Sequence, residues 1–81
     1  MSFNYIMVTI QAIIFKKDSF TKRKADAWLK RYNYVRIKPF HDTLNYLRAR
    51  LKEPNEDKYE YRIIKFNDRI KAVIEYPKIK I

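Results

Sequence analysis

The strongest constraint on the fold is a two-faced stretch in the middle of the chain, TLNYLRARLKEP, residues 43–54. Alternate side chains of an extended strand point to opposite faces of a sheet. The apolar face of this strand consists of Leu47, Ala49 and Leu51. Its other face, which is basic, consists of Tyr46, Arg48 and Arg50. Guanidinium groups are almost never buried without a counter-charge, so the arginines must meet solvent, an acidic neighbour or a partner. The stretch predicts a sheet with one packed face and one basic face.

One segment has the period of an amphipathic helix, and it follows Thr21, a residue type suited to an N-cap. Its apolar side chains recur at the i, i+3, i+4, i+7 spacing of one helical face, and they are Ala25, Trp28, Leu29 and Tyr32. Asn33 suits the left-handed position that ends a helix. Because this stripe is the only apolar face of the helix, it favours packing on the core over a ligand platform.

The remaining apolar segments are short and rich in β-branched or aromatic residues, which favours strands. The predicted strands are residues 8–15, 34–40, 43–54, 59–66 and 70–76. Residues 8–15 are apolar on both faces, which is typical of a central strand. Residues 34–40 alternate only weakly and contain Pro39, which predicts a short or edge strand. The last two strands form a hairpin whose turn lacks glycine, so Asn67 or Asp68 is expected to take any positive φ.

The element order β-α-β-β-β-β predicts an α+β fold with two layers: one four- to five-stranded sheet, mixed or antiparallel, with a single helix packed on one face. We expect a single domain over residues 1–81, with an ordered core at about 6–76 and a loosely held tail at 77–81. No apolar run is long enough to span a bilayer, so no membrane span is predicted. The apolar opening of the chain favours a strand over a signal peptide.

The charge of the chain is strongly basic, with 19 Lys and Arg against nine Asp and Glu, or +10. This balance favours phosphate-rich partners, anionic membranes or acidic proteins. Lys22, Arg23 and Lys24 place three cations at the positive end of the helix dipole, where they are unfavourable. One explanation is that the helix start presents cations and backbone N–H groups to an anion. The alternative is that flexible, screened lysines are simply tolerated there.

The residue types needed for most enzyme chemistry are missing or poorly placed. With no glycine and no cysteine, the chain has neither the ordinary phosphate-cradling loops nor a thiolate metal site. His41 beside Asp42 favours a surface histidine over a catalytic base, because no cysteine and only two outlying serines are available. The acidic residues of the loop after residue 52 favour neutralisation of nearby arginines over binding of Mg²⁺. The sequence therefore predicts a non-enzymatic protein without cofactor or metal.

Several segments, taken in order, resemble a small domain found in tailed phages, often near head-maturation proteins, and in large DNA viruses. They are QAIIF, FTKRKADAWLKRYNY, IK before His41, TLNYLRARLKEP, YRIIKF and IKAVIEY, and they cover most of residues 11–76. The matching marked positions are Trp28, Leu29, Thr43, Asn45, Tyr46, Arg48, Arg50, Pro54 and Arg62. The chain departs from the family at three places. Ala49 stands where the family usually has an aromatic residue, Ile63 stands where it has a threonine, and the hairpin near Arg69 lacks the family's glycine. The resemblance implies a viral protein, in the infected host cell or in the virion, and no particular activity.

Two functional hypotheses follow from these patterns. The first is nucleic-acid binding through the basic sheet face and the helix start, with Tyr46 or Tyr61 stacking on unpaired bases if they share the uncovered face. The residues predicted to contact nucleic acid are Lys22, Arg23, Lys24, Arg36, Lys38, Arg48, Arg50 and Arg62. The alternative is a virion structural or assembly module that docks a viral or host protein through a sheet face or edge. The sequence is compatible with a monomer or a homodimer.

Overall fold

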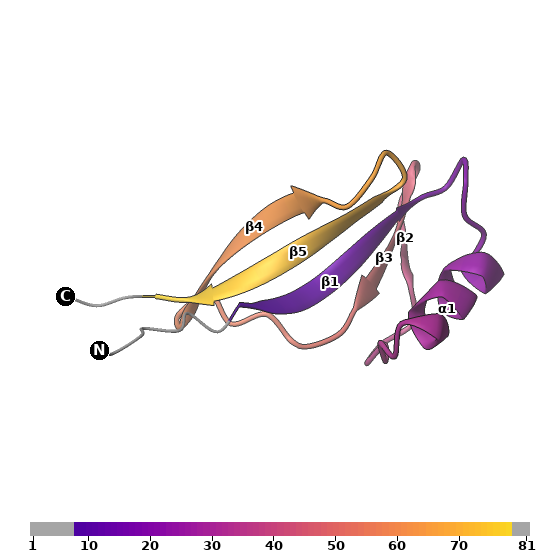
Figure 1. The fold of residues 1–81 in the computed structure, drawn as a ribbon. Coiled ribbons are helices and arrows are strands. Elements are labelled where there is room, and N and C mark those ends of the chain that lie inside the picture. The colour runs from indigo at the N-terminus through magenta and orange to yellow at the C-terminus, as the bar shows by residue number, and fades with distance from the viewer. Residues whose placement is uncertain (1–7, 79–81) are drawn as a thin grey trace, which may run out of the picture.

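The computed structural model describes residues 8–78 and has one helix beside a five-stranded sheet (Figure 1). The elements are β1 (Thr9–Lys16), α1 (Lys22–Arg31), β2 (His41–Asp42), β3 (Tyr46–Arg50), β4 (Tyr59–Lys65) and β5 (Ile70–Pro77). All strand pairs are antiparallel, in the spatial order β2-β3-β1-β5-β4. The predicted α+β class with a single helix on one sheet face is confirmed. Residues 6–7 of the predicted core and 79–81 of the predicted tail lie outside the described residues.

The hydrophobic core lies between α1 and the three central strands. Its fully buried side chains are Ile13, Phe15, Ala25, Leu29, Leu47, Ala49 and Ile70. They come from β1, β3, β5 and the helix, and none comes from the edge strand β4. The apolar face predicted for the strand at 43–54 does meet the helix stripe, because Leu47 and Ala49 join the cluster of Leu29. Figure 1 shows α1 at one end of the elongated sheet, so the helix covers only part of one face.

Aromatic rings complete this core around Phe15. The ring centroids of Phe20, Trp28 and Phe40 lie 5.0, 5.5 and 6.4 Å from that of Phe15, in tilted or edge-on arrangements that aromatic pairs prefer. The predicted role of the helix stripe as core is confirmed for Ala25, Trp28 and Leu29. Tyr32 is different, since it is half exposed and packs on the outer side of Trp28.

Both ends of α1 are fixed by the predicted residues. The Thr21 hydroxyl accepts a hydrogen bond from the Lys24 N–H at 3.2 Å, which makes Thr21 the N-cap. Asn33 has a φ of 63°, and the next residue, Tyr34, donates its N–H to the Leu29 carbonyl at 2.8 Å. Together with the bond from Asn33 N–H to Lys30 O, this is the Schellman arrangement that satisfies the last carbonyls of a helix.

The strand predicted at residues 34–40 is wrong, because the chain there is irregular and β2 comprises only His41 and Asp42. Tyr34 is held by the helix C-terminus, and Pro39 has no N–H to donate to a ladder. A single hydrogen bond, from Ile37 N–H to Arg50 O, joins this segment to β3. Weak alternation was therefore not enough to define a strand.

The hairpin of β4 and β5 is confirmed, but its turn does not use a positive φ at Asn67 or Asp68. Asn33 has the only positive φ found in residues 8–78. Instead, the Asn67 side-chain oxygen accepts from the N–H groups of Arg69 at 2.7 Å and Ile70 at 2.9 Å. The asparagine side chain thus closes the turn by mimicking a backbone carbonyl.

Within residues 8–78 the one helix, ten residues long, is too short and too polar to cross a membrane.

Candidate nucleic-acid interface

The sheet face turned away from α1, called the open face below, is defined by the strand register. Arg48 lies opposite His41 of β2 and opposite Ile14 of β1. Ile14 in turn lies opposite Lys71 of β5, and Lys71 opposite Lys65 of β4. Directly paired side chains share a face, so one row across all five strands carries three cations and a histidine around one isoleucine.

A second row beside the first contains Arg50, Ala12, Val73 and Ile63. Ala12 and Val73 are buried although they face away from the helix, whereas Ile63 is 63 % exposed. Arg50 is half-buried at the end of this row. The prediction that Arg48 and Arg50 mark the face without a helix is therefore confirmed, and the face also carries an apolar strip.

Three cations of the open face lack counter-charges among the described residues. No carboxylate of the described residues lies within 4.0 Å of the side-chain nitrogens of Arg48, Arg50 or Lys71. Lys65 pairs with Asp68 at 3.1 Å, but the Asp68 side chain is 94 % exposed, so water screens this pair strongly. The open face is a cluster of cations that an added anion would stabilise.

Arg48 is a half-buried cation whose hydrogen bonding is incomplete. Its side chain is half-buried, its Nη2 donates to Gln11 Oε1 at 3.4 Å, and its Nε is buried without a hydrogen-bond partner. Burial, and secondly the positive charge of nearby Arg50, lower the pKa of Arg48. The Arg48 guanidinium remains protonated even so, because arginine is charged at every pH at which proteins are folded. Arg48 is thus a charged group that is incompletely paired within the protein.

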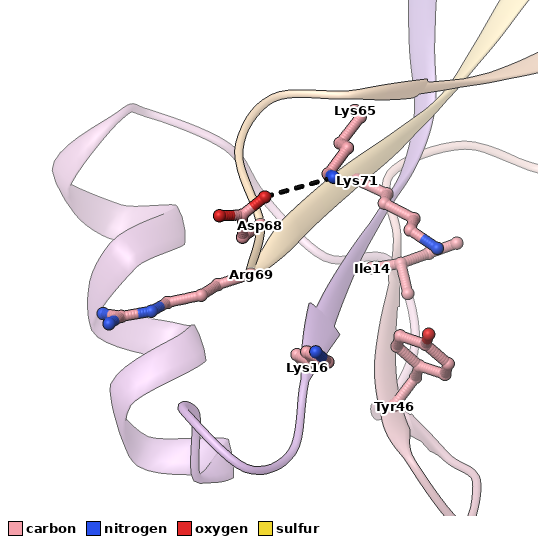
Figure 2. A pocket seen from close by; sticks show the side chains of 7 residues that line it. All are labelled: Ile14, Lys16, Tyr46, Lys65, Asp68, Arg69 and Lys71. Atoms are coloured by element: carbon pink, nitrogen blue, oxygen red, sulfur yellow. Dashed lines mark ion pairs between the residues drawn. The ribbon is translucent and has the colours of Figure 1, made fainter.

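Tyr46 brings an aromatic ring to the same face. It lies opposite Lys16 in the ladder of β3 and β1, and its side chain is half-buried. The Nζ of Lys71 lies 5.3 Å from the centre of the Tyr46 ring. Two surface depressions adjoin here, of about 150 and 290 Å³, and Ile14, Tyr46 and Lys71 line both. Figure 2 shows the smaller one.

A buried carboxylate, Glu75, lies on the open face of β5 and is 1 % exposed. It accepts hydrogen bonds from the hydroxyls of Tyr61 at 2.7 Å and Thr9 at 3.1 Å, and it forms an ion pair with Lys52. Burial raises the pKa of Glu75, but the hydrogen bonds from Lys52, Tyr61 and Thr9 together outweigh it, so the pKa lies below its usual value. The Lys52 charge is therefore already matched within the fold.

This network fixes the second tyrosine proposed for stacking. The Tyr61 hydroxyl donates to Glu75 and also accepts the Asn55 N–H at 2.6 Å. Burial is the main cause that raises the pKa of Tyr61. Tyr46 and Tyr61 do share the open face, but Tyr61 is held in place by Glu75 and Tyr46 is not.

The predicted cations at the helix start lie apart from the open face. Lys22 Nζ is 3.6 Å from Asp42, whose carboxylate also binds Lys17 at 2.5 Å. Lys17, the stronger partner, and Lys22 lower the pKa of Asp42. The Lys24 N–H, one of the first-turn N–H groups that could bind an anion, already donates to the Thr21 hydroxyl. Asp42 thus supplies the negative charge that the first turn of the helix lacks.

The other predicted contacts are engaged elsewhere. Arg36 binds Asp26 at 3.2 Å and lies 4.2 Å from the centre of the Phe40 ring, and this guanidinium is the main cause that lowers the pKa of Asp26. Lys38 pairs with Glu53 at 2.7 Å. Arg62 lies opposite Ile74, on the face of β4 that looks toward the helix layer. Of the eight predicted residues, the structure brings only Arg48 and Arg50 together on the open face.

Comparison with known proteins gave no relative: no protein-family model, curated protein or solved structure matched the chain. The viral resemblance of the sequence stays a prediction.

Four open-face residues were missed by the sequence reasoning, namely Gln11, Lys65, Lys71 and Glu75. The alternation of β5 held a signal for two of them, because Lys71 and Glu75 must oppose the face of Ile70 and Ala72. Gln11 gave no such signal, since it lies at a register shift between Ile10 and Ala12 that only strand pairing reveals. The acidic loop and His41 form no group of three candidate metal ligands within residues 8–78.

Proposed function

We propose that this protein is a non-enzymatic binding domain that holds nucleic acid on the open face of its sheet. The observation that carries the proposal is the set of Arg48 and Arg50 on β3 and Lys71 on β5. These two strands flank β1, and no carboxylate of the described residues neutralises the three cations. Arg50 already perturbs Arg48 electrostatically. A polyanion relieves this repulsion, and its phosphates provide charged acceptors for the guanidinium groups.

The expected strength of the electrostatic contribution can be stated as a salt dependence. Lys16 and Lys65 flank the three unpaired cations, so about five phosphates can be neutralised on this face. The logarithm of the binding constant should then fall against the logarithm of salt concentration with a slope of roughly −3.5 for single strands to −4.5 for duplex. The helix start contributes less, because Asp42 partly neutralises it.

The experiment compares two variants of equal net charge. Arg48→Gln with Arg50→Gln removes two cations from the open face, and Arg31→Gln with Arg62→Gln removes two from elsewhere. In a mobility-shift titration at low salt, the first pair should lose at least about tenfold in affinity and reduce the salt slope by about two. The second pair should stay within about threefold of the unmodified protein. Equal losses in both would show that net charge alone acts, and no binding at low salt would refute the proposal.

One feature favours the alternative, a protein assembly module. β4 is an edge strand, and no other strand of residues 8–78 pairs with its outer edge. Ile63, Ile64 and Phe66, on or beside β4, are 63 %, 37 % and 43 % exposed. Antiparallel pairing of β4 with β4 of a second copy would be self-complementary and would cover such an edge. Light scattering reports the solution mass directly. A dimer in the absence of oligonucleotide that Ile64→Lys converts to a monomer would favour assembly, whereas a monomer would count against it.

A further inference from the structure

The two depressions of the open face differ in chemistry although they share a wall. The smaller, of about 150 Å³, is lined by basic side chains, among them Lys16, Lys65 and Lys71. Figure 2 shows the lining side chains, with Lys71 and Tyr46 beside Ile14, and Arg69 is a further basic residue of the lining. Asp68 is the one acid among its lining residues, and it is 94 % exposed. Lys16 pairs with Asp18 at 3.8 Å, as Lys65 does with Asp68, and these carboxylates are 67 % and 94 % exposed, so water screens both pairs. Three lysines with only screened carboxylates nearby make this depression suited to a phosphate group.

The larger depression, of about 290 Å³, has a mainly apolar surface and is also lined by polar side chains. Ile14, Tyr46 and the exposed Ile63 provide flat or branched apolar surface. His41 and Arg48 supply hydrogen-bonding groups beside it. Its volume lies just below the range of about 300–1,000 Å³ typical of ligand sites, so it matches a single aromatic ring system better than a larger molecule. A nucleobase combines the needed flat apolar faces with a polar edge.

A nucleotide needs these two environments side by side. Lys71 lines both depressions, and its Nζ lies 5.3 Å from the centre of the Tyr46 ring. A base placed against Tyr46 therefore lies next to the lysines that would hold its phosphate. In a duplex the faces of the bases are stacked on one another and are not available to a protein ring, whereas in a single strand they are.

Resting on the function proposed above, we infer that the open face selects single-stranded over double-stranded nucleic acid. One unpaired base occupies the larger depression against Tyr46, and the adjacent phosphate occupies the smaller depression between Lys16, Lys65 and Lys71. Arg48 binds the polar edge of the base or the next phosphate. Tyr46, which no buried carboxylate holds in place, is the stacking residue in this arrangement.

The test is fluorescence anisotropy with three labelled probes of equal length: an oligothymidine single strand, a duplex and a single strand of abasic sugar-phosphate units. The unmodified protein should bind oligothymidine tightest. The loss of stacking in the abasic probe should weaken binding by roughly 5- to 150-fold. Tyr46→Ala should weaken oligothymidine binding by a similar factor, whereas Tyr46→Phe, which keeps the ring, should stay within about twofold. Tyr32→Ala, on the outside of the helix, is the matched control and should also stay within about twofold.

The possible results separate the two proposals. Equal binding of duplex and oligothymidine, or of abasic and base-bearing strands, would overturn single-strand selection and leave nucleic-acid binding standing. Failure of all three probes at low salt would overturn both. The probe comparison uses the unmodified protein, so it decides the question even if Tyr46→Ala does not fold.

Discussion

Removing one oxygen atom from the buried network of the open face provides a sharp test of the structure. Tyr61→Phe deletes the hydroxyl that donates to Glu75 at 2.7 Å and keeps the ring. Glu75 is 1 % exposed, so water cannot readily replace the missing donor. The Asn55 N–H, which also loses its acceptor, belongs to an exposed residue and can turn to water.

The expected cost follows from these contacts. A hydrogen bond to a charged group contributes a net stabilisation of about 1.5–3 kcal/mol. Because Thr9 and Lys52 continue to bind the carboxylate, we expect the lower part of this range, about 1.5–2 kcal/mol. The total free energy of unfolding of a chain of this length is roughly 4–12 kcal/mol. The loss is therefore large enough to shift a denaturation midpoint clearly.

The measurement is urea denaturation at neutral pH, followed by circular dichroism. Tyr59→Phe is the matched control, because this half-buried tyrosine lies on the same strand and its hydroxyl has no hydrogen-bond partner in the described part of the chain. It should change the free energy of unfolding by less than about 0.5 kcal/mol. In a Glu75→Gln background, Tyr61→Phe should cost less than it does alone. Equal costs for the two tyrosine variants, or strict additivity with Glu75→Gln, would refute the reasoning.

Four further predictions concern the rest of the fold. Because the pKa of Glu75 is lowered, its carboxylate stabilises the fold at a pH above the usual pKa of about 4.5, and this stabilisation is lost as the pH falls through the folded-state pKa. The Glu75→Gln variant should therefore have a lower free energy of unfolding at neutral pH and lose less of it on acidification. Thr21→Ala should cost about 1 kcal/mol in chemical denaturation, and Thr21→Ser should restore most of it. Leu29→Ala should cost about 2–5 kcal/mol, and a smaller loss would contradict its place in the core. Asn67→Ala removes both side-chain bonds of the hairpin turn and should destabilise more than Asn67→Asp, which keeps the acceptor.

Local sequence patterns predicted the structure correctly where a single helix or strand decides how the residues are placed. The cap at Thr21, the left-handed Asn33 and the inward face of Leu47 and Ala49 all followed from periodicity and residue type. Each depends on residues within about one helical turn or one strand. The strand predicted at residues 34–40 was wrong because more than one element decides the structure there. The end of the helix holds Tyr34, and Pro39 cannot donate to a ladder, and the weak alternation did not outweigh them.

Only part of the candidate site could be predicted from the sequence. Charge counting treated Lys22, Arg36 and Lys38 as equivalent to Arg48 and Arg50. Whether a cation is free depends on which carboxylate the fold places beside it. The partners of these three lie 20, 10 and 15 residues away in the chain. Such contacts leave no periodic signal.

The sequence by itself determined that one helix and a set of short strands form, and that one strand divides into an apolar and a basic face, because side-chain direction follows from backbone period. Only the tertiary structure decided which cations remain unpaired. In the order β2-β3-β1-β5-β4, only β1 separates Lys71 on β5 from Arg48 on β3. The same order buries Glu75 among Thr9, Lys52 and Tyr61. Pairing between distant strands sets these distances, and charge acts through distance rather than through position in the chain.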